Sequence, residues 1–112
     1  MQQGELWMVS LPQSGGREQV GERPALVVQN ALYGQGSPLV LIVPMTSQLS
    51  ALRFPATVQI APSTKNGLSQ ISVAMGFQTR ALDRGRFRQR IGTLSDADLL
   101  TVIHELEQLI QL

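Results

Sequence analysis

The pattern of hydrophobic and polar positions divides the chain into a long β-rich part and a C-terminal helix. Five short segments are apolar throughout or alternate between apolar and polar residues, as strands do. They are residues 6–9, 25–28, 39–43, 57–60 and 71–75. Two more short strands are expected around 78–80 and 91–93, and a glycine-rich loop is expected at 12–22. This spacing predicts a small, strongly curved antiparallel sheet or barrel.

The last segment of the chain has helical periodicity. Its apolar residues form one stripe that consists of Leu99, Val102, Ile103, Leu106, Leu109 and Ile110. Ser95 is a good N-cap, and Asp96 and Asp98 lie in the first turn, where the helix dipole favours anions. We therefore predict a helix that starts after Ser95 and packs on the sheet. A shorter helical stretch is expected from Asp83 to about Gln89, weakened by Gly85.

Length and composition indicate one folded domain that spans residues 1–112. The chain is 43% hydrophobic and 15% charged, which is far from the composition of disordered proteins. It has no cysteine, so disulfides, thiolate metal sites and cysteine nucleophiles are excluded. No apolar stretch resembles a signal peptide or approaches the ~18 residues of a membrane span. We expect a cytoplasmic protein that does not enter a membrane.

Charge is distributed unevenly, although the net charge is only +1. Residues 1–94 hold nine basic and four acidic groups, a balance of +5, whereas residues 95–112 hold four acidic groups and neither lysine nor arginine, a balance of −4. Eight of the nine basic residues are arginine, whose planar guanidinium suits phosphate, so an anionic partner is favoured. The arginines at 84, 86, 88 and 90 cannot share one face of a helix. Some of them are expected to be solubilising charges or partners for acids of another chain.

The candidate chemistry is restricted to arginine, carboxylate, hydroxyl and backbone groups. The single histidine, His104, falls on the polar side of the predicted helix, so the sequence offers neither a catalytic triad nor a metal-binding cluster. No metal and no cofactor are therefore expected. Polar and charged residues gather at strand ends in three segments, 17–23, 46–48 and 78–80. Each segment alone is more typical of a solvated loop or an ordinary turn than of a binding site.

Five motifs lie in order along nearly the whole chain. The longest is Gly16-x-Glu18-Gln19-x-Gly21-x-Arg23-Pro24-Ala25-Leu26-Val27-Val28. The others are Gly4-Glu5-Leu6-Trp7, Val43-Pro44-Met45-Thr46-Ser47, Gln78-x-Arg80-Ala81-Leu82-Asp83 and Ile91-Gly92-x-Leu94-Ser95-Asp96. Together they resemble the motifs of the MazF/PemK toxins, the growth-arresting halves of bacterial toxin–antitoxin pairs.

The resemblance implies a fold, an activity and two protein partners. The fold is a compact SH3-like barrel, related to that of CcdB, with a C-terminal helix, and it forms a homodimer. The family's usual activity is metal-independent, sequence-specific cleavage of single-stranded RNA, chiefly messenger RNA. The substrate's own 2′-hydroxyl attacks, and the products carry a 2′,3′-cyclic phosphate and a 5′-hydroxyl. A small MazE-like antitoxin with an acidic disordered tail covers the site.

The resemblance also assigns candidate site residues. Arg23 and Thr46 correspond to the family's core catalytic pair, and Glu18 corresponds to an acidic residue implicated in some members. The RNA-binding candidates are Arg17, Gln19, Ser47, Gln48, Arg53, Gln78 and Arg80. Loops such as 33–38 and 47–53 are expected to read the bases.

The general base stays open at this point. Arginine stays protonated at neutral pH and is a poor base, so Glu18 is the better candidate on chemical grounds. One branch of the family has a histidine before the Glu-Gln pair and an aspartate before the glutamine of the Gln-x-Arg block. This chain has Arg17 and Phe77 at those positions, so the acid–base assignment of that branch does not carry over.

Two other functions compete with RNA cleavage. One is a non-catalytic RNA-binding barrel that keeps the fold and has lost turnover, which the presence of Arg23 and Thr46 argues against. The other is a CcdB-like toxin that acts on a protein such as DNA gyrase, which the long motif at 16–28 argues against. Sequence-specific RNA cleavage is the function that the sequence favours.

Overall fold

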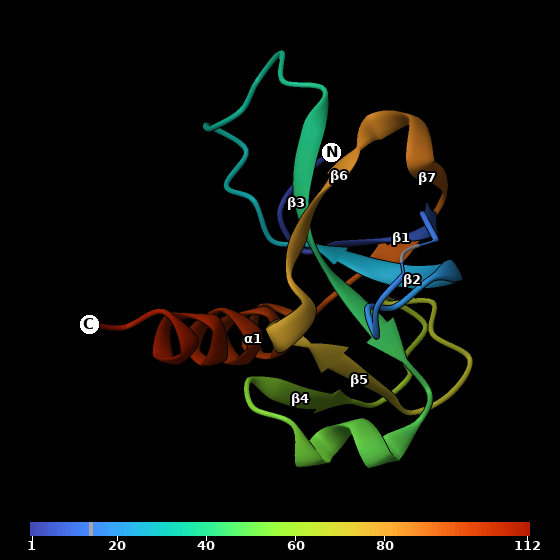
Figure 1. Ribbon diagram of the computed structural model, residues 1–112. Coiled ribbons are helices and arrows are strands. Elements are labelled where there is room, and N and C mark those ends of the chain that lie inside the picture. Colours follow the sequence, from blue (N-terminus) through green and yellow to red (C-terminus); the bar gives the residue numbers. More distant parts are fainter. Residues whose placement is uncertain (14) are drawn as a thin grey trace.

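The protein is a mainly β fold with one C-terminal helix (Figure 1). The computed structural model describes residues 1–13 and 15–112, and Ser14, within the predicted loop at 12–22, lies outside the described residues. The strands are β1 (Glu5–Leu11), β2 (Gly21–Val27), β3 (Leu39–Thr46), β4 (Thr57–Ile60), β5 (Ser72–Met75), β6 (Arg80–Asp83) and β7 (Phe87–Thr93). The helices are the short 3₁₀ helices η1 (Leu49–Arg53), η2 (Gly76–Gln78) and η3 (Arg84–Arg86) and the α-helix α1 (Asp96–Leu109). No helix in the described part is long and apolar enough to span a membrane.

The strands form one antiparallel sheet in the order β4-β5-β3-β2-β1-β7, and β6 also pairs with β3. The long strand β3 is the common element of this sheet. One of its edges pairs with β2, while the other pairs with β6 along Leu39–Ile42 and then with β5 at Met45 and Thr46. The predicted curved antiparallel sheet is confirmed.

Two irregularities curve the sheet at the β1–β7 pair. The register shifts between Leu6 and Trp7 and again between Met8 and Val9, so Ile91 and Arg88 of β7 have no directly opposed residue on β1. An extra residue in one strand of an antiparallel pair bends that strand and increases its twist. The β7 strand therefore bends away from a flat sheet and leads the chain into α1.

The largest hydrophobic cluster lies between the curved sheet and α1. Strand residues Leu6, Leu26 and Met45 are fully buried there, and Val102 of α1 packs among them. Leu99, Ile103 and Leu106 of the predicted apolar stripe also pack against this core. The stripe ends there, because Leu109 is 44% exposed and Ile110 is 79% exposed. The end of α1 projects past the strands, so its last turn has no sheet beneath it (Figure 1).

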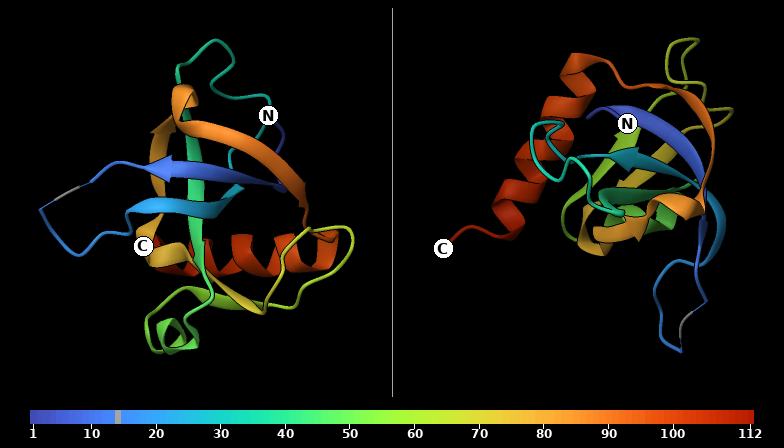
Figure 2. Two further views of the ribbon diagram at one scale, coloured as in Figure 1. Left: turned by 90° about the vertical axis from the view of Figure 1, so that its right-hand side faces the viewer. Right: turned by 90° about the horizontal axis from the view of Figure 1, so that it is seen from above.

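Both strands that carry the central site residues extend further than predicted. β2 begins at Gly21 and β3 ends at Thr46, so Arg23 and Thr46 belong to strands rather than to the flanking loops. Arg23 is fixed by antiparallel pairing with Val9, and Thr46 by pairing with Val73. Residues 12–13 and 15–20, between β1 and β2, project from the body of the molecule (Figure 2).

The predicted helix from Asp83 to Gln89 is wrong. Only Arg84–Arg86 form a short 3₁₀ helix, which starts where the Asp83 carboxylate accepts a hydrogen bond from the Gly85 backbone N–H (2.7 Å). From Phe87 the chain is strand β7, whose first ring makes an edge-to-face contact with Trp7 (centroids 5.8 Å apart). Tertiary packing against β1 thus overrides the weak helical tendency of this segment.

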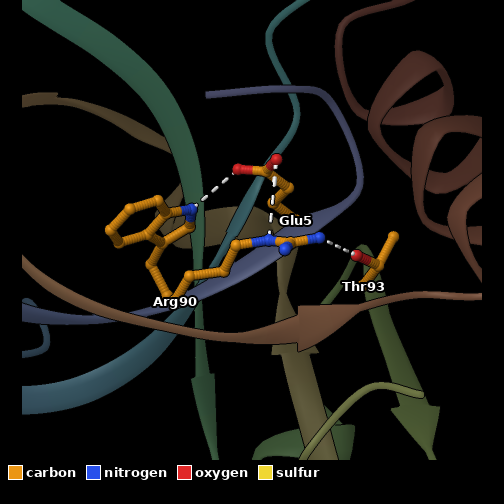
Figure 3. A network of polar contacts seen from close by, with 4 residues as sticks. Glu5, Arg90 and Thr93 are labelled. Atoms are coloured by element: carbon orange, nitrogen blue, oxygen red, sulfur yellow. Dashed lines mark hydrogen bonds and ion pairs between the residues drawn. The ribbon is translucent and has the colours of Figure 1, made fainter.

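The arginines of β7 find acidic partners within the same chain. Arg88 lies 3.9 Å from Glu22, and Arg90 lies 3.6 Å from Glu5. Figure 3 shows that Glu5 also accepts a hydrogen bond from the indole N–H of Trp7 (2.9 Å), while Arg90 donates to the hydroxyl of Thr93 (2.8 Å). Arg90 thus ties β7 to β1 and Arg88 ties it to β2, so partners on another chain are not needed for these two arginines.

The cap of α1 provides a stability test. The Ser95 hydroxyl accepts the backbone N–H of Asp98 (3.1 Å), as predicted for an N-cap. Ser95→Ala should lower the free energy of unfolding by about 1 kcal/mol. The matched control is Thr101→Ala, which removes a hydroxyl bonded to Ala97 within the same helix (3.0 Å) and replaces threonine by a better helix former. Urea unfolding measures both variants, and equal midpoints for Ser95→Ala and the wild type would contradict the assignment.

Candidate active site

A cavity of about 670 Å³ opens where the β1–β2 loop, the end of β3 and the start of β6 meet. Of the predicted site residues, it is lined by Arg17, Glu18, Gln19, Arg23, Thr46, Gln48, Gln78 and Arg80. These residues come from three segments that are far apart in the sequence. The three polar segments at strand ends therefore meet in one cavity. No single segment indicated this in the sequence.

Arg23 reaches the cavity from the rigid strand β2. It is half-buried, and its Nε–H donates to the carbonyl oxygen of Val20 (3.0 Å). A guanidinium carries five N–H donors in a planar fork, so four remain on Nη1 and Nη2. The bond to Val20 holds the fork in one orientation, and a planar fork of this kind matches the oxygens of a phosphate.

Thr46 is the last residue of β3 and is only 5% exposed. Its hydroxyl oxygen accepts the backbone N–H of Gln48 (3.2 Å), in a turn that threonine commonly forms. A hydroxyl can donate one hydrogen bond while it accepts another. The Thr46 O–H is therefore oriented by the turn and can donate to a ligand in the cavity.

The β1–β2 loop is attached to the cavity wall through the backbone of Gln19. The Gln19 N–H donates to Oε1 of Gln78 (2.8 Å), and Nη2 of Arg80 donates to the Gln19 carbonyl oxygen. Burial lowers the pKa of the Arg80 guanidinium from its ordinary value, and the negative charge of Glu18 partly offsets this. Arginine stays charged in proteins, so Arg80 remains a cation beside Glu18.

Two buried polar atoms at this attachment have no hydrogen-bond partner among the described residues. They are Oε1 of Gln19, an acceptor, and Nε of Arg80, a donor. Leaving a buried polar group unpaired costs roughly 1–3 kcal/mol. Both residues line the cavity, so a polar ligand that enters it can supply the missing partners.

A second cavity of about 370 Å³ adjoins the first. Its polar lining includes Glu22, Ser47 and Gln70, and Arg23 and Thr46 also line it. These two side chains therefore border both cavities. An extended ligand that occupied both would pass directly over Arg23 and Thr46.

Arg53 is the one predicted site residue that lines neither of these two cavities. It ends η1, and its guanidinium lies over the ring of Phe54, 4.9 Å from the centroid. Phe54 and Phe77 do line the larger cavity, and sequence reasoning did not select either of them as a binding residue. Single aromatic residues 23 positions apart are as typical of a core as of a binding surface, so no local signal identified the pair.

The remaining ionisable groups do not form a metal centre in the described residues, where no cluster of three or more His, Asp or Glu side chains is placed to hold an ion. His104 is exposed on α1, as predicted. Arginine, hydroxyl, amide and carboxylate groups thus define the chemistry of the cavity.

These features define a small curved-sheet protein with a cation-lined cavity suited to a polyanion. Residues 2–110 match the family described as the PemK-like, MazF-like toxin of type II toxin-antitoxin systems. The chain belongs to this family.

Individual relatives agree with the family match. The protein named Endoribonuclease MazF from Staphylococcus saprophyticus is 31% identical over 102 residues, which cover 91% of this chain and 84% of that protein. The crystal structure of MazF (Form-I) from Deinococcus radiodurans is similar with a TM-score of 0.83 and 26% identity, covering 100% of this chain and 97% of that one. The MazE-MazF structure (Form-III) from the same organism gives a TM-score of 0.71 and 26% identity over 98% of this chain and 95% of that one.

The attachment of the β1–β2 loop generates a prediction. Gln78→Leu removes the oxygen that accepts the Gln19 N–H, so amide hydrogen exchange at Gln19 should accelerate by about tenfold, the equivalent of one ordinary hydrogen bond. Gln59→Leu, on the exposed side of β4, is the matched control and should leave that rate unchanged. Exchange measured by NMR that stays slow at Gln19 in Gln78→Leu would show that the loop is held by other contacts.

Proposed function

We propose that this protein is a sequence-specific endoribonuclease that cleaves single-stranded RNA without a metal ion. The observation that carries the proposal is the position of Arg23 and Thr46 between two adjoining cavities. Membership of the toxin family and the likeness to a protein named Endoribonuclease MazF support it. Two consecutive nucleotides, one in each cavity, place the phosphate between them beside Arg23 and Thr46.

Cleavage at this phosphate uses the substrate's own 2′-hydroxyl. Its oxygen attacks the phosphorus, the bond from phosphorus to the 5′-oxygen of the next nucleotide breaks, and a 2′,3′-cyclic phosphate forms. The proton of the 2′-hydroxyl passes to a base, and an acid returns a proton to the departing 5′-oxygen, which leaves as a hydroxyl. The enzyme needs no nucleophile of its own.

Arg23 and Thr46 stabilise the charge that develops on the crowded phosphate. The Nη1 and Nη2 donors of Arg23 bind two phosphate oxygens, and the Thr46 hydroxyl donates to one of them. Both side chains are already oriented, Arg23 by Val20 and Thr46 by the backbone of Gln48. Such preorganised donors lower the barrier without rearrangement during the reaction.

Glu18 is the proposed base. Glu18 lines the same cavity as Arg23, and a carboxylate can accept the 2′-hydroxyl proton, whereas an arginine, which stays protonated in proteins, cannot do so efficiently. The guanidinium of Arg23 is the proposed donor to the departing 5′-oxygen, and the proton that Glu18 has accepted afterwards restores the guanidinium. The negative charge of Glu18 acts on Arg80, so the two groups are close enough to interact electrostatically.

The other polar residues hold the RNA chain. Arg17 and Arg80 contact phosphates in the larger cavity, while the amides of Gln19, Gln48 and Gln78 suit the hydrogen-bonding edges of bases. Ser47 contacts the nucleotide in the second cavity. The mixture of cations and amides matches a single-stranded RNA whose bases are unpaired.

The protein partners follow from the family. The Deinococcus radiodurans MazF structure is solved together with MazE, and we propose that a MazE-like antitoxin regulates this chain by laying an acidic disordered segment over the same cavity. The arginines Arg17, Arg23 and Arg80 provide the complementary charge. The proposal includes a homodimer and a cytoplasmic location.

Arg23→Lys tests the catalytic centre. The lysine keeps the positive charge and loses the two-pronged fork, so cleavage should slow by about 10²–10³-fold while RNA binding changes little. Thr46→Val, which removes a hydroxyl at similar volume, should also act mainly on turnover. The measurement is single-turnover cleavage of a short RNA with the preferred motif, with binding followed on an analogue that carries a 2′-deoxy sugar at the cleavage position.

The matched control is Arg84→Lys. Arg84 also donates its Nε–H to a backbone carbonyl, that of Ser37 (2.8 Å), and it lies outside both cavities. Its variant should cleave at the wild-type rate. Wild-type cleavage by Arg23→Lys would move the catalytic centre elsewhere, and wild-type cleavage by Glu18→Gln would eliminate Glu18 as the base.

Metal removal tests the reaction type. Cleavage should proceed at an unchanged rate in excess EDTA, because the proposed charge stabilisation comes from Arg23 and Thr46 rather than from a Lewis acid. Analysis of the product ends should find a cyclic phosphate and a 5′-hydroxyl. Activity that is lost on chelation and restored by a divalent ion would overturn this mechanism.

A further inference from the structure

Two phenylalanine rings form an aromatic platform, defined by Phe54 and Phe77, in the wall of the larger cavity. The rings are stacked with their centroids 4.8 Å apart and their planes inclined by 29°. Phe77 is half-buried and packs against a small core of Ala51, Val73 and Met75. Phe54 is the outer ring and is 41% exposed. Folding alone buries the inner ring and leaves the outer one accessible from the cavity.

Hydrogen bonds hold the aromatic platform in place, within the turn at 52–57 and between this turn and Gly76. The hydroxyl of Thr57 donates to the carbonyl oxygens of Leu52 (3.3 Å) and Phe54 (2.9 Å). Ala56 adopts a left-handed backbone conformation (φ 57°), and its carbonyl accepts the N–H of Gly76 (2.8 Å).

The approach at this contact is so close that it requires glycine. A Cβ at position 76 would lie 2.4 Å from the oxygen of Ala56. The turn that carries Phe54 is thereby fixed against the residue that precedes Phe77. A left-handed alanine is strained, and the surrounding hydrogen bonds maintain it.

A planar cation already occupies the position over the outer ring. The guanidinium carbon of Arg53 lies 4.9 Å from the centroid of Phe54. Arg53 is exposed on a short 3₁₀ helix, so its side chain can leave that position at little cost. A flat group of similar size can then take its place.

On the basis of the proposed function, we propose that the aromatic platform is the stacking subsite for one nucleobase of the RNA substrate. The base lies over Phe54 at the rim of the larger cavity, in the place of the Arg53 guanidinium, and Arg53 turns to a phosphate of the same strand. Unpaired bases stack on aromatic side chains irrespective of their identity. The amides of Gln48 and Gln78 line the same cavity, so they can hydrogen-bond to the edge of the stacked base.

The chemistry of the cavity favours a base over an apolar side chain of a protein partner. An apolar side chain would satisfy the ring of Phe54 and leave Oε1 of Gln19 and Nε of Arg80 without partners among the described residues. A nucleotide satisfies all three kinds of group, because it combines a flat π-face, a hydrogen-bonding edge and a phosphate. The aromatic platform therefore positions one base, and the neighbouring amides add specificity, while Arg23 holds the phosphate.

The test is a coupling experiment between Phe54 and individual bases. The probe is an RNA of the preferred motif with a 2′-deoxy sugar at the cleavage position, together with a series in which each base in turn is replaced by an abasic sugar. The proteins are the wild type, Phe54→Leu, Phe54→Trp and the control Phe87→Leu. Phe87 also lies in an aromatic pair, with Trp7, and lines neither cavity.

We expect one abasic position to weaken wild-type binding by about 5- to 150-fold, the range of one stacked base. Phe54→Leu should weaken binding of the intact RNA by a similar factor. An abasic sugar at that one position should then cause no further loss of affinity in this variant, whereas abasic sugars elsewhere should act as they do on the wild type. Phe54→Trp should restore both the affinity and the sensitivity, and Phe87→Leu should bind as the wild type does. A purely structural role of Phe54 would produce neither the position dependence nor the rescue.

The failures can be told apart. In one outcome the wild-type protein binds and cleaves RNA, but Phe54→Leu weakens binding equally at every abasic position or does not weaken it at all. That outcome would overturn the platform and leave the proposed function intact. Wild-type protein that neither binds nor cleaves RNA would overturn both. A loss for Phe54→Leu that is confined to binding of the antitoxin segment would assign the platform to the protein partner and overturn its role in base stacking.

Discussion

The continuous hydrogen bonding of β3 is the constraint on which the rest of the structure depends. This strand pairs with β2 on one edge and with β6 and then β5 on the other, so three strands take their position from it. Its last residue, Thr46, enters the cavity, and its neighbour β2 carries Arg23. The relative position of the two proposed catalytic side chains is therefore set by backbone hydrogen bonds between adjacent strands. A site built on paired strands is held more accurately than one built on loops.

Around this rigid base, short loops complete the cavity through a few specific contacts. The β1–β2 loop is attached by Gln78 and Arg80 to the backbone of Gln19, and the turn at Phe54 is attached by Gly76. Both attachments lead to the single stretch from η2 to β6. This stretch thus links the loop that carries Glu18 to the turn that carries the aromatic platform. The cavity combines a fixed centre with a wall whose two halves depend on the same few residues.

Much of this arrangement could be predicted from the sequence, because the signals concerned are local. The apolar and alternating runs identified β1 to β5, Ser95 marked the start of α1, and the motif order indicated the family. The wrong helix at 83–89 and the overextended stripe at Leu109 and Ile110 have one cause. Whether a segment finds a packing surface is decided by distant parts of the chain, here by β1 and by the extent of the sheet. For the same reason the Phe54–Phe77 pair was not recognised, since two rings become a platform only after the chain has folded.

The arginine-rich strand β7 lies at one end of the sheet, next to β1. Terminal strands present backbone groups that can recruit a strand of another molecule and extend into aggregates. In β7 two bulges break the regular spacing of those groups, and charged side chains at Arg88 and Arg90 surround them. A regular run of apolar residues here would have paired equally well with β1 and would have offered an open template to other chains. The irregularity of this strand therefore disfavours pairing with a strand of another chain, and straightening it would favour fibrous assembly even if the cavities stayed intact.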